Sequence, residues 1–342
     1  MKKPIALAAA LLMLPFAAQA SHLRSPWDGH PVALTAAPYT CPAIHPLSPD
    51  LTTNGFYSDS HSSIIDPVKW KAYAETAGPY KQLGIDIVNA ADAYRTTGSR
   101  AAVECAIQHM DAAAKEGVFT GHMSSRQAYY VQGWVIGAVA IAYLKIRDSG
   151  LVPHHQQKEI LAWIQQVVPQ TTHYYDTGDQ KNNHLYWAGV EVAAAGIAAN
   201  NRKLFNWGIN TYHVGVAQIQ PDGSLPREMR RGRRALHYHL YALSPLVYLA
   251  EFGEDNGLHL YAERDYAIKK LAKLSTDGLV NNSFFVKATG IPQDLPPNGP
   301  IAAEQISWAR PYAARFPSPQ LSKLLAQAPS LSYMYLGGLP PG

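Results

Sequence analysis

Apolar side chains recur at helical spacing along most of the chain, and the alternating apolar and polar runs typical of strands are nearly absent. The longest such segment, residues 124–147, starts at a Ser N-cap candidate and ends in Lys145 and Arg147, just before Gly150. The pattern therefore predicts an all-α protein. Further helices are predicted over residues 156–168, 183–199, 204–219, 236–252 and 258–274.

These helices return at regular intervals and are joined by turns rich in Gly, Pro and Asn, which predicts stacked antiparallel helical hairpins. Such hairpins form either an open solenoid or an α/α toroid, and periodicity does not distinguish the two. With 47% hydrophobic and 16% charged residues, the chain is able to bury a large core. Its length suits one toroidal domain as well as two ordinary ones.

The N-terminus has the three parts of a secretory signal: Lys2 and Lys3, an apolar run over residues 5–16, and Ala18-Gln19-Ala20. We therefore expect residues 1–20 to be a signal peptide and residues 21–342 to be an exported protein. No later uncharged stretch is long enough for a convincing membrane span, so no membrane partner is expected.

Basic side chains are concentrated in one short segment. Without Lys2 and Lys3, 27 of the 29 basic side chains remain against 25 acidic ones, so net charge is uninformative. Five arginines nevertheless lie between Arg227 and Arg234, with Glu228 as the one acid among them. Such a cluster favours docking of a polyanion, unless these arginines form a solvated loop and pair elsewhere. No nucleic-acid motif accompanies it, so nucleic acid is not an expected partner.

Two segments, residues 182–187 and 227–239, supply an amide, an imidazole, a guanidinium and a phenol. These groups suit eliminative cleavage of a polyuronate, in which charge moves from C5 onto the C6 carboxylate. Asn183 and Arg231 suit neutralisation of that carboxylate. Tyr238 and His184 suit removal of the C5 proton and protonation of the departing O4.

The same segments closely resemble the alginate lyases of polysaccharide lyase family five, in which an Asn-His pair precedes an Arg and a Tyr seven residues apart. Here Arg231 and Tyr238 have this spacing, and His184 lies 47 residues before Arg231. The likeness runs from about Cys41 to about Phe316. It implies a bacterial, periplasmic or secreted enzyme that forms an incomplete α/α toroid with a tunnel-like cleft, a single domain over residues 21–342 and a lid at residues 52–67.

Stereochemistry refines the roles that the resemblance implies. In mannuronate the C5 proton and O4 leave from the same side of the ring, so Tyr238 serves as base and then as acid. Because a free phenol titrates near ~10, we expect Arg231 or Arg234 to lower its pKa. His184 either completes the neutralisation or acts as base for a substrate whose C5 proton faces the other way. Of the two asparagines, Asn183 is expected in the cleft and Asn182 at the helix N-cap.

Several aromatic and polar residues are candidates for substrate subsites. Trp187 shares a helix face with Asn183, and three residues of the preceding helix are similarly placed. Core packing is the alternative interpretation for the tryptophans. The predicted subsite residues are Trp187, Arg234, His237, Gln127, Tyr130, Trp134 and Tyr57, and a second cluster at Trp308, Arg310, Tyr312 and Arg315 is a candidate to reach the cleft.

Cys41 and Cys105 are the two cysteines of the chain. An even count in an exported protein favours a disulfide between the N-terminal segment and an early helix, as does the family resemblance, whereas two buried thiols are the alternative. Neither cysteine has metal-ligand spacing, and the pairs His154-His155 and His237-x-His239 lack an H-E-x-x-H context. No metal or cofactor is expected. His237 and His239 are instead candidates to line the cleft beside Tyr238.

The substrate stays open between several polyuronates. The family leads us to expect a lysine after the aromatic-x-Ser element, but this chain has Asp59 there. Glucuronan and hyaluronan are therefore candidates beside alginate, because glucuronate also has its C5 proton on the side of O4. The expected protein is a monomer that binds an anionic polysaccharide. The alternatives are a non-catalytic polyuronate-binding or export protein, and a hydrolase, which would require a pair of carboxylates.

Overall fold

The computed structural model describes residues 22–342, so the predicted signal peptide lies outside the described residues. Helices account for the regular structure of this part of the chain, and the β-contacts found in it are isolated bridges. The prediction of an all-α protein is confirmed.

The α-helices are α1 (Pro67–Thr97), α2 (Arg100–Glu116), α3 (Arg126–Ile146), α4 (His154–Thr177), α5 (Asn183–Ala198), α6 (Arg202–Ala217), α7 (Pro226–Met229), α8 (Ala235–Glu254), α9 (Glu263–Val280), α10 (Ser283–Thr289), α11 (Ala303–Ile306), α12 (Ala309–Arg315) and α13 (Pro319–Gln327). Short 3₁₀ turns are η1 (Arg147–Ser149), η2 (Gly232–Arg234), η3 (Leu260–Ala262) and η4 (Met334–Leu336).

The helices predicted over residues 124–147, 183–199, 204–219 and 236–252 correspond to α3, α5, α6 and α8. Two boundaries differ from the prediction. Helix α4 continues through Pro169 to Thr177. Helix α9 begins later than residue 258, because η3 and three residues with positive φ, at positions 264–266, precede its regular part. The apolar pattern did not define α1 and α2.

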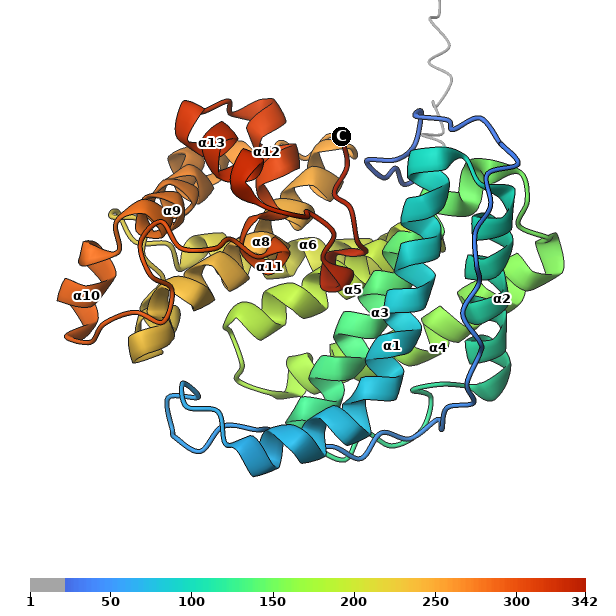
Figure 1. Ribbon diagram of the computed structural model, residues 1–342, viewed down its shortest axis with the longest axis horizontal. Coiled ribbons are helices and arrows are strands. Elements are labelled where there is room, and N and C mark those ends of the chain that lie inside the picture. Colours follow the sequence, from blue (N-terminus) through green and yellow to red (C-terminus); the bar gives the residue numbers. More distant parts are fainter. Residues whose placement is uncertain (1–21) are drawn as a thin grey trace, which may run out of the picture.

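Neighbouring helices in the sequence also pack together in space. Helix α1 packs against α2 and α3, α3 against α5, α5 against α6 and α8, and α8 against α9. Figure 1 shows the resulting arc, which runs from α2 on one side to α9 and α10 on the other. This arrangement is the expected incomplete α/α toroid.

Helix α3 forms the centre of the core. Residues 126–149 are long and apolar enough to cross a membrane by length and composition, yet 89% of the most apolar window is buried inside the protein. Its N-terminus is capped by Ser125, whose side chain accepts a hydrogen bond from the backbone N–H of Ala128. The helix therefore carries Tyr130 and Trp134 on a rigid, buried element.

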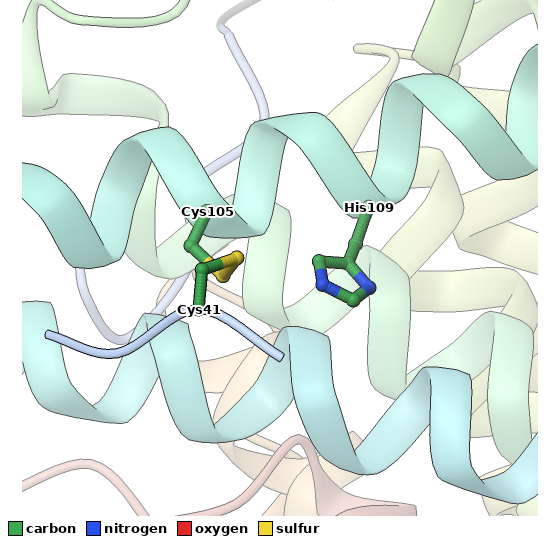
Figure 2. Close-up of side chains that lie close together, drawn as sticks. All are labelled: Cys41, Cys105 and His109. Atoms are coloured by element: carbon green, nitrogen blue, oxygen red, sulfur yellow. A yellow bond between two sulfur atoms is a disulfide. The ribbon is translucent and has the colours of Figure 1, made fainter. Parts of the chain in front are cut away.

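The N-terminal segment is tied to α2 by a disulfide between Cys41 and Cys105, as predicted. Figure 2 shows His109 beside this bond. The sulfurs and the imidazole lie within 4.8 Å of one another. Both sulfurs are joined to each other, however, and His109 Nε2 is 3.2 Å from the carbonyl oxygen of Pro42. In the oxidised protein this group therefore offers one imidazole to a metal and no thiolate.

Loss of this disulfide is expected to destabilise the protein. The bond closes a loop with a sequence separation of 64 residues, and removal should lower the free energy of unfolding by about 2–5 kcal/mol through the entropy of the unfolded chain. The measurement is urea unfolding of a Cys41→Ser, Cys105→Ser double variant. Thiol labelling of the denatured, unreduced wild type should find no free Cys, and two labelled thiols would contradict the bond.

Candidate active site

A cavity of about 850 Å³ is bordered by the segment over residues 52–67, by α1, α3, α5 and α8, and by residues 333–335. Tyr238, His184 and Arg231 all border it. So do five of the predicted subsite residues, namely Tyr57, Gln127, Tyr130, Trp134 and His237. The structure thus brings together groups from segments more than 180 residues apart.

Tyr238 extends from the first turns of α8, and its ring lies against the Arg231 guanidinium, with Cζ 3.3 Å from the ring centroid. Its hydroxyl is 3.0 Å from the Tyr57 hydroxyl. The expected lowering of the Tyr238 pKa is wrong for this conformation. Burial raises the pKa by more than Arg231 and Arg234 lower it, so the phenol keeps its proton at neutral pH.

Arg231 connects the cavity to the 52–67 segment. Its Nε donates to the His61 carbonyl at 2.8 Å and its Nη2 to the Ser62 carbonyl at 2.8 Å. Helical spacing does not place this residue; it precedes η2, just before α8. A guanidinium held in this way keeps its planar face on the Tyr238 ring, and it would have to exchange two carbonyl oxygens for a substrate carboxylate.

Arg234 holds two residues of the cavity wall, Tyr57 and His237, by hydrogen bonds. It donates to Asp294 at 3.0 Å, to the Tyr57 hydroxyl at 2.5 Å and to His237 Nε2 at 3.0 Å. It is not among the residues that border the cavity in this conformation, so its direct contact with substrate stays a prediction. Burial, Arg234 and Arg231 lower the pKa of His237 to about 3, which keeps that imidazole neutral.

His184 lies at the start of α5, with its ring stacked on Tyr130 at a centroid distance of 3.6 Å. Burial, Arg231 and Arg126 hold the pKa of His184 well below its usual value. The imidazole is therefore neutral at pH 7 and has one N–H donor and one acceptor. The same wall carries Trp134, which stacks on Tyr335 at 4.5 Å.

Of the two asparagines before His184, Asn182 is at the helix N-cap as expected, whereas Asn183 is placed differently from the expectation. Asn182 caps α5 by accepting from the backbone N–H of His184, and it also borders the cavity. Asn183 is fully buried and donates from its side chain to Glu228 at 2.7 Å. As the first residue of α5 it faces α7, because Glu228 also accepts its backbone N–H. Asn183 thus joins the arginine segment to α5 and does not reach into the cavity.

Three further predictions are corrected by packing. Trp187 is buried against Tyr241 behind the cavity wall, so it is a core residue. His239 points away from Tyr238, with Nδ1 2.7 Å from the Ala235 carbonyl and Nε2 accepting from the Leu225 N–H. The late cluster does not reach the cavity. Trp308 and Tyr312 are buried, Arg315 pairs with Glu251, and Arg310 lies outside the cavity lining.

The 52–67 segment covers the cavity with Tyr57 and Asp59, where the family pattern led us to expect a lysine. The Asp59 carboxylate accepts the backbone N–H groups of Ser63 and Ile64 and the Ser63 hydroxyl. These hydrogen bonds bring the Asp59 pKa to about 2. The Asp59 carboxylate therefore stabilises the turn whose His61 and Ser62 carbonyl oxygens accept from Arg231.

Sequence reasoning missed several residues of the cavity wall. Lys81 from α1 and Glu304 from α11 border it, as do Tyr333 and Tyr335. The last two come from residues 332–339, which we call the C-terminal strap. They lie beyond the stretch that resembles the family, and the available signal was an aromatic-x-aromatic element followed by Gly337 and Gly338.

A buried ion pair holds the C-terminal strap in place. Lys145 Nζ on α3 is 2.5 Å from Asp92 Oδ1 on α1 and also donates to the carbonyls of Gly337 and Leu339. Asp92 Oδ2 accepts from the Leu339 N–H and the Ser332 hydroxyl. The pair therefore fixes the wall that Tyr333 and Tyr335 supply.

Replacement of Lys145 by Met should lower the free energy of unfolding by about 3–5 kcal/mol, because it leaves Asp92 buried without a counter-charge. Urea unfolding measures the change. Lys71→Met is the matched control, since Lys71 forms an exposed pair with Glu75 and should change stability little. Equal stability of the two variants would contradict the anchoring role.

The helical arc and its cavity of cations, phenols and imidazoles are those of a polysaccharide lyase. A protein-family model for alginate lyases matches residues 50–285. The chain belongs to the alginate lyase family.

Similar proteins align with most of this chain. This chain is 34% identical over 290 residues to a polysaccharide lyase of Stenotrophomonas maltophilia, and the alignment covers 84% of this chain and 85% of that protein. It is 30% identical over 308 residues to an alginate lyase of Azotobacter vinelandii, with coverage of 87% and 82%. The fold matches alginate lyase A1-III of Sphingomonas species A1, in a complex with a tetrasaccharide, at a TM-score of 0.80, 24% identity and coverage of 89% and 86%.

Proposed function

We propose that the protein cleaves 1,4-linked polyuronates, with poly-mannuronate as the preferred substrate, by β-elimination. The C5–H and C4–O4 bonds break, a C4–C5 double bond forms, and a 4,5-unsaturated uronate remains at the new non-reducing end. One observation carries the proposal: a phenol, a guanidinium and a neutral imidazole border the same cavity, from Tyr238, Arg231 and His184.

Tyr238 is the proposed acid and base. On a same-side substrate its oxygen takes the C5 proton as its own hydroxyl proton passes to O4, so the residue returns to its starting state. The Arg231 guanidinium over the ring favours the negative charge that this oxygen acquires on the way.

Arg231 and His184 are the proposed groups that neutralise the C6 carboxylate. Arg231 offers a planar pair of donors, which the lid carbonyls of His61 and Ser62 occupy in the structure. His184 offers one N–H. Asn183 acts through Glu228 and α7 by placing Arg231 next to the start of α5.

The choice of polymer follows from the cavity and from the relatives. Arg126, Lys81 and Arg231 give the cavity positive charge that suits a polyanion. The relatives' names point to alginate, and the tetrasaccharide complex points to an extended site. Glucuronan and hyaluronan are secondary candidates, because Asp59 stands where the family pattern led us to expect a lysine.

A screen of mannuronan, guluronan, glucuronan and hyaluronan tests this proposal through the absorbance of the unsaturated product. We expect the highest rate on mannuronan and the lowest on guluronan, whose C5 proton faces the opposite side. A protein that retains these polymers without shortening them would contradict catalysis, and uptake of water without a double bond would indicate a hydrolase.

We also propose that the protein is exported to the periplasm, or secreted, by residues 1–20. The signal pattern and the disulfide support this proposal, since such bonds persist in oxidising compartments. Cell fractionation and N-terminal sequencing of the mature protein should give a periplasmic or secreted chain that begins at Ser21. A cytoplasmic chain that keeps Met1 would contradict it.

A further inference from the structure

A second, much smaller cavity shares Tyr130, Trp134 and His184 with the substrate cavity. Its volume is about 10 Å³, and its walls come from α3, α4 and α5. Three of its lining residues, all on α5, have a buried polar atom without a hydrogen-bond partner among the described protein atoms. These atoms are His184 Nδ1, Trp187 Nε1 and Glu191 Oε2.

Glu191 is a costly residue to place here. Its side chain is fully buried, and its Oε1 accepts from the Thr171 hydroxyl at 3.0 Å. Helix α3 makes room for it with two glycines. A Cβ on Gly133 would lie 2.9 Å from Glu191 Oε2, and one on Gly137 would lie 3.2 Å from its Cα. An apolar side chain would avoid the cost of burying a carboxyl group, so its presence suggests a role.

The small cavity has about the volume that one water molecule needs, and it offers that molecule three polar partners. We propose that Glu191 is a positioning residue that acts through one water molecule in this cavity and fixes the tautomer of His184, so that Nε2 carries the proton into the cleft. This inference rests on the proposed function of His184 as a donor to the substrate carboxylate.

Hydrogen-bond directions give the tautomer. Trp187 Nε1–H is a donor only. Burial raises the pKa of Glu191 to about 8, so at neutral pH its carboxyl group is protonated and Oε2 is a donor as well. A water that accepts from both must donate to its third partner, His184 Nδ1. Because His184 is neutral, its single proton is then on Nε2, where it faces the carboxylate.

The constraint is released when Glu191 loses its proton. A carboxylate accepts one hydrogen of the water, which can then either donate its other hydrogen to His184 Nδ1 or accept one from it, so the Nδ1–H tautomer becomes accessible beside Nε2–H. The titratable groups around Glu191 are Tyr129 and Tyr130 on α3, Tyr175 on α4 and His184 on its own helix. Burial raises the pKa of Tyr130 and that of Tyr175, so both phenols stay neutral through the pH range in which Glu191 titrates.

The test is ¹⁵N NMR of histidine-labelled protein from pH 6 to pH 9, with the His184 signals assigned by comparison with His184→Gln. In the wild type we expect the Nε2–H tautomer at pH 7 and a change toward Nδ1–H as the pH rises through about 8. Glu191→Gln supplies a donor that does not titrate, so it should keep the Nε2–H tautomer throughout. A wild type with Nδ1–H at pH 7, or a Glu191→Gln protein with the same pH course, would overturn the proposal.

Activity gives a second readout. Glu191→Met preserves volume but removes the donor, and we expect kcat to fall by about tenfold with little change in KM. Glu191→Gln should stay within about threefold of the wild type at pH 7. A normal tautomer in folded Glu191→Met would overturn the inference, and if that variant does not fold, the Glu191→Gln comparison decides. Absence of lyase activity in the wild type would instead contradict the proposed function, while the NMR result would still test the tautomer.

Discussion

Replacement of Tyr238 by Phe is expected to lower the cleavage rate of mannuronan by about 100- to 10,000-fold, the range that general acid and base catalysis contributes. The change removes the hydroxyl that moves the proton and keeps the ring under Arg231. The fold and polymer affinity should therefore survive. Steady-state formation of the unsaturated product measures the rate, and circular dichroism and polymer binding confirm that the variant is folded.

Tyr57→Phe is the matched control, because its hydroxyl lies 3.0 Å from that of Tyr238 but is not assigned a proton transfer to substrate. We expect it to lose far less activity than Tyr238→Phe. Substantial turnover of mannuronan by folded Tyr238→Phe would reject the shared acid and base and shift the role to His184. His184→Ala should be comparably harmful on mannuronan if the imidazole binds the carboxylate.

Replacement of Arg231 by Ala is expected to reduce turnover by about 100- to 1000-fold, because a preorganised countercharge is lost where negative charge builds toward the transition state. Folding stability should change much less, since the two carbonyl partners of Arg231 lie on the covering segment near the surface. Product formation and urea unfolding, measured on the same variant, separate the two effects.

Arg230→Ala removes the same charge one residue earlier, from an exposed side chain that borders a different pocket. It should retain most of the activity. Near-normal turnover by Arg231→Ala on every cleavable polymer would exclude Arg231 from this role and leave Arg230 or Arg234 as the candidates.

Much of the fold was predictable because apolar periodicity reports burial directly. Helices α3, α5 and α8 are buried along nearly their whole length, and α6 buries one face. The pattern failed where backbone geometry decided the outcome. Pro169 did not end α4, and the left-handed residues at the start of α9 left no trace in the hydropathy.

The site was predictable where its residues are close in sequence or fixed by the family motif. Tyr238, His184 and Arg231 border the cavity as expected. Side-chain direction was not predictable, as Asn183 and Trp187 show: both lie on α5, and both point into the protein. The contribution of Tyr333 and Tyr335 depends on contacts with α1 and α3 that no local pattern reports.

The C-terminal strap has a consequence for the order in which the enzyme becomes active. Asp92 and Lys145 are made early in synthesis, whereas the Gly337 and Leu339 carbonyls that Lys145 binds and the Leu339 N–H that Asp92 binds follow Lys145 by 192 residues or more. The wall of aromatic rings is therefore completed only after residues 332–339 have folded back onto α1 and α3. We expect a nascent chain that still lacks these residues to be inactive, even where its earlier helices have formed.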